Sequence, residues 1–560
     1  MLTLYHNLRK VLNQSFPTIL LFINVLSIAL GFMYFLGGQG ILFPNPYGIL
    51  MLAAFLGNIG LAFKEEQYKV LGYLYLTFSS IWMLLIMIIN TAASLTPTIM
   101  KTQSILSAAF VFSLFLLGGN IAGNKVFERK DKVGKVTVLK AAQINVKKNL
   151  GNYIKNIVII LFSIVLYCGL FIAINLLKTF KNVFFESVIS EYALFFAIMF
   201  LSTGVLIIKL LDRKKYHLYY NIVLPTTIFI FLVCMLPLIS IPSLLKNAEK
   251  SFREAFGESY KTNINYQGNY FRQSAFSIPE YFYGVPSDDY QVSRNIHFYK
   301  GTEGVDKGLE LYFDVYSPVK DGRELPGGNS VIIRIHGGGW TSGNKGASNF
   351  AQMNKYFAEQ GYIVFDIQYG LNDVLNWLHL LPVSQKNIGK FTIDDMVRHI
   401  GIFTSYLADH REEFKADINS VFISGGSAGG QLTLASGLGL SSGKYSSILN
   451  PEVHVKGLIP FYPANGLSQI FEIGGQMEFV DPALLVSKDS PPCLIYQGDH
   501  DGLVSASIAK KFRNTYIEKG NKECTVILMP FGGHGSDLYF PGYYNQIFLY
   551  YMERFIYQYK

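Results

Sequence analysis

The chain has 560 residues, of which 50% are apolar and only 16% are charged, against the quarter that is usual in a soluble protein. This composition argues against a wholly soluble protein and predicts long segments that lie in lipid. The net charge of +9 would suit binding of nucleic acid, but the basic residues are spread over separate short loops instead of one face, so we expect no nucleic-acid partner.

Seven apolar runs in the first half have the length of about 20 residues that a helix needs to cross a membrane. The second run is the weakest, because it is short and is preceded by Pro44 and Pro46. The first run has no small-residue cleavage site and is followed by further runs, so we interpret it as an uncleaved helix and not as a signal peptide. The sequence therefore predicts a membrane domain over 1–245, with spans at 17–36, 47–63, 70–89, 104–122, 157–177, 192–211 and 222–245.

The Lys and Arg residues of the short connections predict the orientation of this domain, because cationic loops stay on the cytoplasmic side. The opposite loops carry few cations, and there Lys178 and Lys181 are offset by Glu186 and Glu191. We predict a cytoplasmic amino terminus and an extracytoplasmic segment after residue 245, a prediction that one merged or missed span would reverse. The basic residues on the predicted cytoplasmic side are Arg9, Lys10, Lys64, Lys69, Lys125, Arg129, Lys130, Lys132, Lys135, Lys140, Lys147, Lys148, Lys155, Arg213, Lys214 and Lys215.

The predicted spans contain almost no charge apart from Lys209, which lies near a cytoplasmic end and can extend its amine to the surface. A path for protons or ions would normally include a buried ionisable residue. Anchoring and packing therefore explain these helices best, with lipid-substrate binding and transport as alternatives. Seven spans are more than an anchor needs, and the sequence does not explain the excess.

The second half of the chain has a different pattern. Residues 246–289 are polar, aromatic and irregular, and we predict an extracytoplasmic linker there. From about residue 290, short β-rich runs alternate with segments of helical period, which is typical of a mostly parallel sheet flanked by helices. The predicted domain covers 290–560, with eight strands at 292–299, 309–316, 331–335, 362–369, 420–424, 455–461, 493–497 and 524–529.

The helices and cysteines of this half add local detail. Thr392, followed three residues later by Asp395, predicts a capped helix start, and further helices are predicted at 506–519 and 544–557. Cys493 and Cys524 begin successive strands, where a disulfide would be strained and is disfavoured. No CxxC pair or His-rich spacing predicts a metal site.

The stretch GGSAGG, 425–430, lies between a predicted strand and a helical segment. Gly425 and Gly429 remove side chains that would collide in so sharp a turn, and Ser427 would project above the sheet as a nucleophile. The amide of Ala428 would point from the helix start toward an oxyanion. A purely structural turn is the alternative interpretation.

The stretch IIRIHGGGW, 332–340, places three glycines after an earlier strand. An oxyanion hole needs a second backbone donor from a neighbouring loop, and a side chain there would block the substrate carbonyl. We predict that the amides of Gly338 and Gly339 face the same oxygen as the amide of Ala428. His336 is expected to hold the loop and not to catalyse.

A base and an orienting acid are expected on loops after later strands, the acid first along the chain. YQGDHDGLV, 496–504, offers Asp499 and Asp501, and PFGGHGSD, 530–537, offers His534. His534 fits this order better than His500 and is the predicted base. Asp501 is favoured over Asp499, because the loop must leave the strand before its carboxylate can reach an imidazole.

Together these residues resemble the α/β-hydrolase fold, and within it the esterase and lipase group that includes hormone-sensitive-lipase-like enzymes and bacterial acetyl-esterase-like proteins. The resemblance covers about 309–557 and is carried by LELYFDVYSP, HGGGW, GGSAGG, SPPCLIYQGDHDGLV and GGHGSD. Many relatives have an arginine after the tyrosine of the segment YGLNDVLNWLHLLPVSQ, 369–385, so the pocket wall and the acyl preference stay open. The membrane half carries no such resemblance. The implied roles are nucleophile for Ser427, acid for Asp501, base for His534, and oxyanion donors for Gly338, Gly339 and Ala428.

The resemblance implies a serine hydrolase that cleaves carboxylic esters, short-acyl or acetyl esters favoured, through an acyl-enzyme and without a metal or cofactor. The predicted spans add that this hydrolase is anchored in a membrane. The expected partners are the lipid bilayer and an ester substrate, for which a cell-envelope glycan or a lipid-linked ester is a hypothesis. An acyltransferase or peptidase would use the same triad. A receptor or transporter with a non-catalytic outer domain is a further alternative, against which the intact triad argues.

Overall fold

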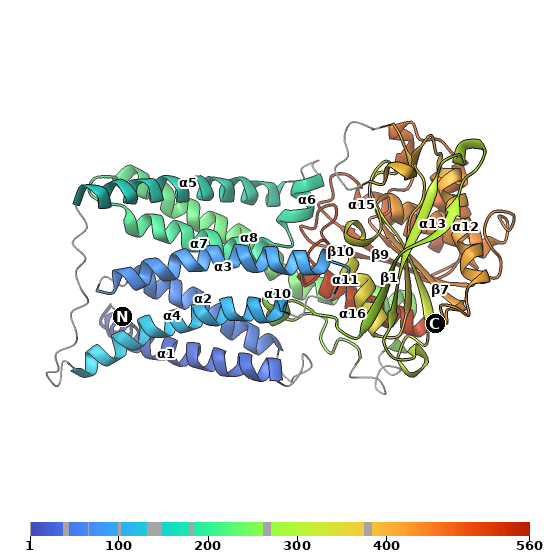
Figure 1. Cartoon of the computed structure of the whole chain (residues 1–560). Coiled ribbons are helices and arrows are strands. Elements are labelled where there is room, and N and C mark those ends of the chain that lie inside the picture. The colour runs from blue at the N-terminus through green and yellow to red at the C-terminus, as the bar shows by residue number, and fades with distance from the viewer. Residues whose placement is uncertain are drawn as a thin grey trace.

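The structure is a computed structural model that describes residues 2–36, 44–64, 67–98, 102–131, 148–178, 183–260, 270–374 and 383–560. Figure 1 shows a bundle of long helices on one side and a twisted sheet covered by helices on the other. The amino terminus lies at the end of the bundle that is far from the sheet, and the carboxy terminus lies in the sheet domain.

The bundle contains the apolar helices that the sequence predicts. Within the described residues, seven helices are long and apolar enough to cross a membrane. These helices agree with the predicted spans in number and place, so the predicted polytopic helical domain is confirmed. The bundle helices are α1 (Leu2–Leu36), α2 (Pro44–Lys64), α3 (Lys69–Leu95), α4 (Gln103–Asp131), α5 (Lys148–Leu177), the short α6 (Val183–Ile189), α7 (Ala193–Leu210) and α8 (His217–Phe256).

The last bundle helix continues beyond the predicted end of its span. α8 reaches Phe256, so the predicted linker 246–289 begins as helix and not as irregular chain. The reason is packing: the rings of Phe252 and Phe256 lie 5.1 and 5.0 Å from those of Tyr551 and Phe555 in the carboxy-terminal helix. A second short helix, α10 (Ile278–Tyr283), is also buried within the linker. The predicted domain boundaries themselves remain a prediction.

Polar and small residues join the bundle helices. The side-chain amides of Asn24 in α1 and Asn58 in α2 donate to each other's oxygens at 2.9 and 2.8 Å. Gly118 of α4 leaves the room for this pair, since a Cβ there would lie 2.1 Å from Asn58. In lipid, where apolar surface gives helices little reason to associate, such close contacts and internal hydrogen bonds stabilise the packing.

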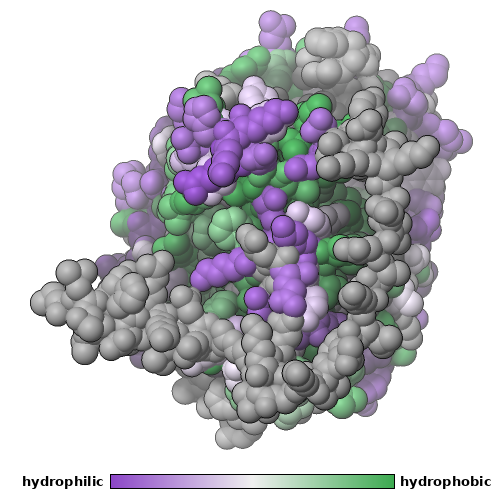
Figure 2. All heavy atoms as spheres, turned by 90° about the vertical axis from the view of Figure 1, so that its left-hand side faces the viewer, coloured by the Kyte–Doolittle hydropathy of each residue, from purple (hydrophilic) through white to green (hydrophobic). Residues whose placement is uncertain are grey.

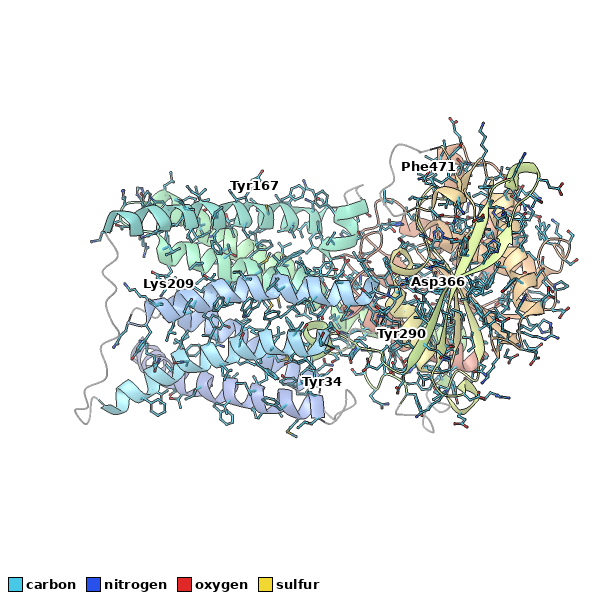
Figure 3. The ribbon with its side chains drawn as sticks, in the orientation of Figure 1. Tyr34, Tyr167, Lys209, Tyr290, Asp366 and Phe471 are labelled. Atoms are coloured by element: carbon cyan, nitrogen blue, oxygen red, sulfur yellow. The ribbon has the colours of Figure 1, made fainter. Side chains whose placement is uncertain are left out.

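The end of the bundle far from the sheet is its polar end. Figure 2 looks onto this end and shows patches of hydrophilic side chains interspersed with apolar ones. Figure 3 places Lys209 toward the same end of α7, where its amine donates to the carbonyl of Phe63 at 3.4 Å. The predicted position of this lysine near the end of its span is therefore found.

The carboxy-terminal half forms one eight-stranded sheet, and all eight predicted strands are confirmed. The strand order is β1-β2-β4-β3-β7-β8-β9-β10. Neighbours are parallel except where β2 pairs antiparallel with β1 and with β4, so the sheet is mostly parallel, as expected for an α/β-hydrolase domain. The strands are β1 (Tyr290–Lys300), β2 (Glu310–Pro318), β3 (Ser330–Ile335), β4 (Ile363–Ile367), β7 (Asp417–Gly426), β8 (Val455–Phe461), β9 (Cys493–Gly498) and β10 (Cys524–Met529).

Helices connect and cover these strands. The predicted capping box is present, because the Thr392 hydroxyl accepts from the Asp395 amide at 3.3 Å and the Asp395 carboxylate accepts from the Thr392 amide at 2.9 Å. A two-stranded pairing of β5 (Leu371–Asn372) with β6 (Ile388–Gly389) was not predicted, since two residues carry no periodic signal. The helices are α11 (Ala351–Glu359), α12 (Ile393–Asp409), α13 (Ala428–Ser442), α14 (Met477–Val480), α15 (Ala506–Glu518) and α16 (Tyr543–Tyr559), with 3-10 turns at Gly304–Asp306, Gly322–Glu324, Gly346–Asn349, Gln385–Asn387, Leu467–Phe471 and Pro482–Leu485.

The sheet domain sits directly on the bundle end opposite the polar one. The buried Lys355 of α11 donates to the carbonyl oxygens of Ala93 and Thr96, at 3.0 and 2.9 Å, and so pairs a cation with the carboxyl end of α3. The hydroxyl of Tyr290, labelled at the boundary in Figure 3, donates to the carbonyl of Pro97 at 2.9 Å. Loops of the sheet domain also contact the short bundle helix α6.

Candidate active site

Ser427 occupies a strained turn between β7 and α13. Its φ of 57° and ψ of −119° lie in a backbone region that residues other than glycine rarely adopt. Such strained backbone conformations are typical of functional positions. The flanking glycines are required by contact: a Cβ would lie 2.5 Å from the Ile335 carbonyl at Gly425 and 2.3 Å from it at Gly429. The turn therefore packs directly against the end of β3, which leaves no room for a side chain at either glycine.

The structure brings the predicted triad residues together. Nε2 of His534 lies 3.0 Å from Oγ of Ser427, and Nδ1 of His534 lies 3.0 Å from Oδ2 of Asp501. The other oxygen of Asp501 accepts from the amides of Leu503 and Val504 at 3.0 and 2.7 Å, which fixes the carboxylate on the loop after β9. The catalytic roles of these residues remain predictions, but their mutual distances suit proton transfer.

The two disfavoured candidates, Asp499 and His500, pair with each other. Asp499 pairs with His500 at 2.6 Å and accepts from the amide of Phe531 at 2.7 Å, so its carboxylate is engaged at the base of the two loops. Of the two candidate acids, Asp501 is the one that contacts His534.

Charge around His534 favours its protonated form. Burial by itself lowers the pKa of the imidazole, but the carboxylates of Asp501, Glu186 and Asp537 outweigh burial and raise the pKa above its usual value. An imidazole that is stabilised as the cation can take a proton from a neighbouring hydroxyl.

The glycine loop after β3 has the shape that a donor loop needs. Gly338 and Gly339 have φ values of 121° and 61°, and a Cβ at Gly338 would lie 2.0 Å from the Ser342 carbonyl. Within the described residues, the amides of Gly338, Gly339 and Ala428 donate to no protein acceptor. These amides are therefore available to a ligand oxygen, and their role as oxyanion donors remains a prediction.

His336 packs within this loop. Its Nδ1 donates to the Gly337 carbonyl at 2.9 Å, and its ring stacks on Tyr369 with centroids 4.4 Å apart. Burial lowers the pKa of His336 to about 4, so the ring is neutral near pH 7. These contacts agree with the expected structural role.

Sequence reasoning missed two groups beside the triad. Tyr462, which follows β8 with a φ of 36°, has its ring 4.6 Å from that of His534 and donates to Asp537 at 2.7 Å. Burial raises the pKa of Asp537 to about 6. The only available signal was the position of Asp537 three residues after His534, which distinguishes it poorly from any loop carboxylate.

The remaining site predictions concern metals, thiols and the pocket wall. Among the described residues, no group of three or more His, Cys, Asp or Glu could hold a metal ion. Cys493 and Cys524 are register partners on β9 and β10, and both are free thiols. The segment 369–385 is the one in which many relatives have an arginine after the tyrosine. Part of it lies outside the described residues, so the acyl preference stays open.

Comparisons with known proteins point to esterases. The family model described as BD-FAE matches residues 313–473. The chain is similar to the probable carboxylic ester hydrolase LipM of Mycobacterium tuberculosis, with 24% identity over 238 residues that cover 38% of this chain and 51% of LipM. It is also similar to the esterase LipC of the same organism, with 21% identity over 233 residues that cover 37% of this chain and 53% of LipC. The chain therefore spans about half the length of these curated relatives.

Solved structures were also compared with this chain. A truncated carbohydrate esterase from gut microbiota superposes with a TM-score of 0.36 and 19% identity, and the match covers 47% of this chain and 96% of that one. The sheet order agrees with the predicted α/β-hydrolase fold of the carboxy-terminal half, and the curated proteins to which this half is similar are named as ester hydrolases.

Proposed function

We propose that this protein is a membrane-anchored serine hydrolase that cleaves carboxylic esters with Ser427, His534 and Asp501. The observation that carries the proposal is the hydrogen-bonded row in which His534 lies 3.0 Å from both Ser427 and Asp501. Free amides of a glycine loop beside the same serine support it, and so do the activities named for LipM and LipC.

In the proposed mechanism, His534 takes the proton of Ser427 as the Oγ atom attacks the ester carbonyl. Asp501 holds the imidazole with its Nδ1 proton and stabilises the cation that forms. The oxyanion receives hydrogen bonds from the amides of Gly338, Gly339 and Ala428, each contributing about 3 kcal/mol. The C–O bond to the alcohol then breaks as His534 protonates the leaving oxygen, and water, deprotonated by His534, releases the acid from the acyl-enzyme.

A series of esters tests this proposal. The full-length protein in detergent should hydrolyse p-nitrophenyl acetate and butyrate, with kcat/KM at least about tenfold above that for the laurate, because short acyl groups are the proposed substrates. Release of p-nitrophenol followed by absorbance measures each rate, and a peptide p-nitroanilide serves as the comparison. Hydrolysis of the anilide without hydrolysis of any ester would replace the proposal by a peptidase, and acyl transfer to an added alcohol would extend it to an acyltransferase.

The orientation is part of the proposal: the amino terminus is cytoplasmic and the hydrolase domain is extracytoplasmic. The gathering of hydrophilic residues at the bundle end far from the sheet supports it (Figure 2), because the basic connections carrying Lys64, Lys69 and Arg213 to Lys215 follow helices that run to that end. An outward site makes a cell-envelope glycan ester or a lipid-linked ester the proposed substrate class.

Protease accessibility tests the orientation. A carboxy-terminal epitope tag on the full chain should be removed by protease added to intact cells, whereas an amino-terminal tag should survive until the cells are lysed. Immunoblotting of both tags gives the readout, and a cytoplasmic marker protein is the control for lysis. Protection of the carboxy-terminal tag in intact cells would reverse the proposed orientation.

A further inference from the structure

One carboxylate of the helical bundle reaches the two loops that carry the proposed acid and base. Oε2 of Glu186, in the short helix α6, accepts from the amide of Gly502 at 2.9 Å and from the amide of His534 at 3.0 Å. Gly502 follows Asp501 directly, and His534 is the proposed base itself. A single oxygen atom therefore joins the backbone next to the acid to the backbone of the base.

The close contact between α6 and these loops requires glycines in the loop that carries His534. A Cβ at Gly533 would lie 2.8 Å from Cβ of Glu186, and a Cβ at Gly535 would lie 3.1 Å from Cβ of Ser187. The two glycines that flank His534 thus allow the helix to approach the loop backbone. Glu186 is only 7% exposed, so its contacts with the amides are shielded from water.

Within the described residues, these two amides donate to no acceptor other than Glu186. The bases of the loops are joined by their own bonds, such as the one from the His500 amide to the Gly532 carbonyl at 2.9 Å. Toward the tips, where Asp501 and His534 must face each other, the acceptor shared by the two loops is Glu186. A buried amide that loses its acceptor has to move until it finds another one.

We infer that Glu186 is a positioning residue for the triad, and that through it the helical bundle aligns the acid and the base. This inference rests on the proposed function and deepens it. It gives the bundle a role beyond anchoring, since α6 follows α5 in the chain, contacts it, and precedes α7. The carboxylate does not touch the reacting atoms, so its effect passes through the loops and through its charge.

The charge of Glu186 gives a measurable signature. Groups facing His534 are Asp501 after β9, Asp537 on its own loop, Tyr462 after β8 and Glu186 of α6. Lys178 and His500 line the same small pocket as Glu186. Because negative charge stabilises the imidazolium, loss of the Glu186 charge lowers the pKa of His534, and the acid limb of the kcat/KM profile moves to lower pH.

Three variants of the full chain in nanodiscs test the inference with p-nitrophenyl acetate. In Glu186→Gln the remaining oxygen still accepts from the amides, so we expect a kcat within about threefold of wild type and an acid limb about half a pH unit lower. In Glu186→Ala both bonds are lost, and kcat should fall about 10- to 100-fold with little change in KM, because misplaced groups lose rate and not binding. Lys355→Met removes another contact between bundle and sheet domain, and should keep the wild-type pH profile.

The outcomes separate the inference from the proposed function. A wild-type protein without ester hydrolysis would overturn the function and the inference together. An active wild type with a Glu186→Ala variant of equal kcat would overturn the inference alone, as would a Lys355→Met variant that loses as much activity. If Glu186→Ala does not fold, the Glu186→Gln profile decides, and an acid limb that does not move overturns the inference.

Discussion

Replacing Ser427 by alanine should lower kcat/KM for p-nitrophenyl acetate by about 10⁵-fold or more, the scale of loss when a serine nucleophile is removed. The Ser427 hydroxyl contacts Nε2 of His534 at 3.0 Å, and alanine leaves that imidazole without a proton to accept. Covalent labelling of the full-length protein by a fluorophosphonate probe should disappear in parallel. Labelling in gel together with the ester assay provides the measurement.

The fold should survive this substitution. The turn at Ser427 is as strained for serine as for alanine, and the hydroxyl caps no backbone group of α13. We expect the free energy of unfolding to change by less than about 1 kcal/mol. Ser441→Ala, near the other end of the same helix, is the matched control and should label like wild type. Undiminished labelling of Ser427→Ala would remove Ser427 as nucleophile.

The parts of this site that could be predicted from sequence are those for which one short stretch contains both the functional residue and the residues that explain its position. GGSAGG lies where β7 meets α13, and the glycines are there because Ile335 and the turn approach within contact. Asp501 and His534 each lie just beyond a strand, and parallel strands bring their carboxyl ends to one edge of the sheet. The order of elements was therefore enough to bring Ser427, Asp501 and His534 together.

What could not be predicted depends on packing between distant segments. Glu186 is 316 residues before Gly502, and in the sequence it is only a charge in an outer loop. The linker after residue 245 is polar by composition, yet it continues as helix because Phe252 and Phe256 find partners in α16. Such contacts are settled by the relative placement of two domains, for which no local pattern exists.

The tyrosine beside the base shows the same limit within one domain. Tyr462 follows β8, where the sequence shows only an aromatic residue before a proline. Its positive φ and its bond to Asp537 arise because β8 lies next to β7, so that its end faces the Ser427 turn. A pattern of residue types can predict where a strand ends. Which neighbouring residues a side chain at that end contacts depends on the order of the strands in the assembled sheet.

Asp501→Asn should lower kcat about 10⁴-fold while leaving the protein folded, because the wrong imidazole tautomer then faces the serine. The asparagine oxygen can still accept from Leu503 and Val504, which leaves its NH₂ group toward Nδ1 of His534. Nδ1 must then accept, Nε2 carries the proton, and the Ser427 hydroxyl loses its base. Stopped-flow or steady-state hydrolysis of p-nitrophenyl acetate from pH 5 to 9 measures the loss.

The pH profile makes this second prediction specific. In wild type, activity should rise with pH through the pKa of His534, which neighbouring carboxylates hold above its ordinary value of about 6.5. Asp501→Asn removes the carboxylate nearest the imidazole, so the residual activity should rise at lower pH. Asp499→Asn is the matched control: its carboxylate pairs with His500, and activity should stay within about threefold of wild type. If Asp499→Asn lost more activity than Asp501→Asn, the acid of the triad would be Asp499, and the loop after β9 would have to adopt another conformation during turnover.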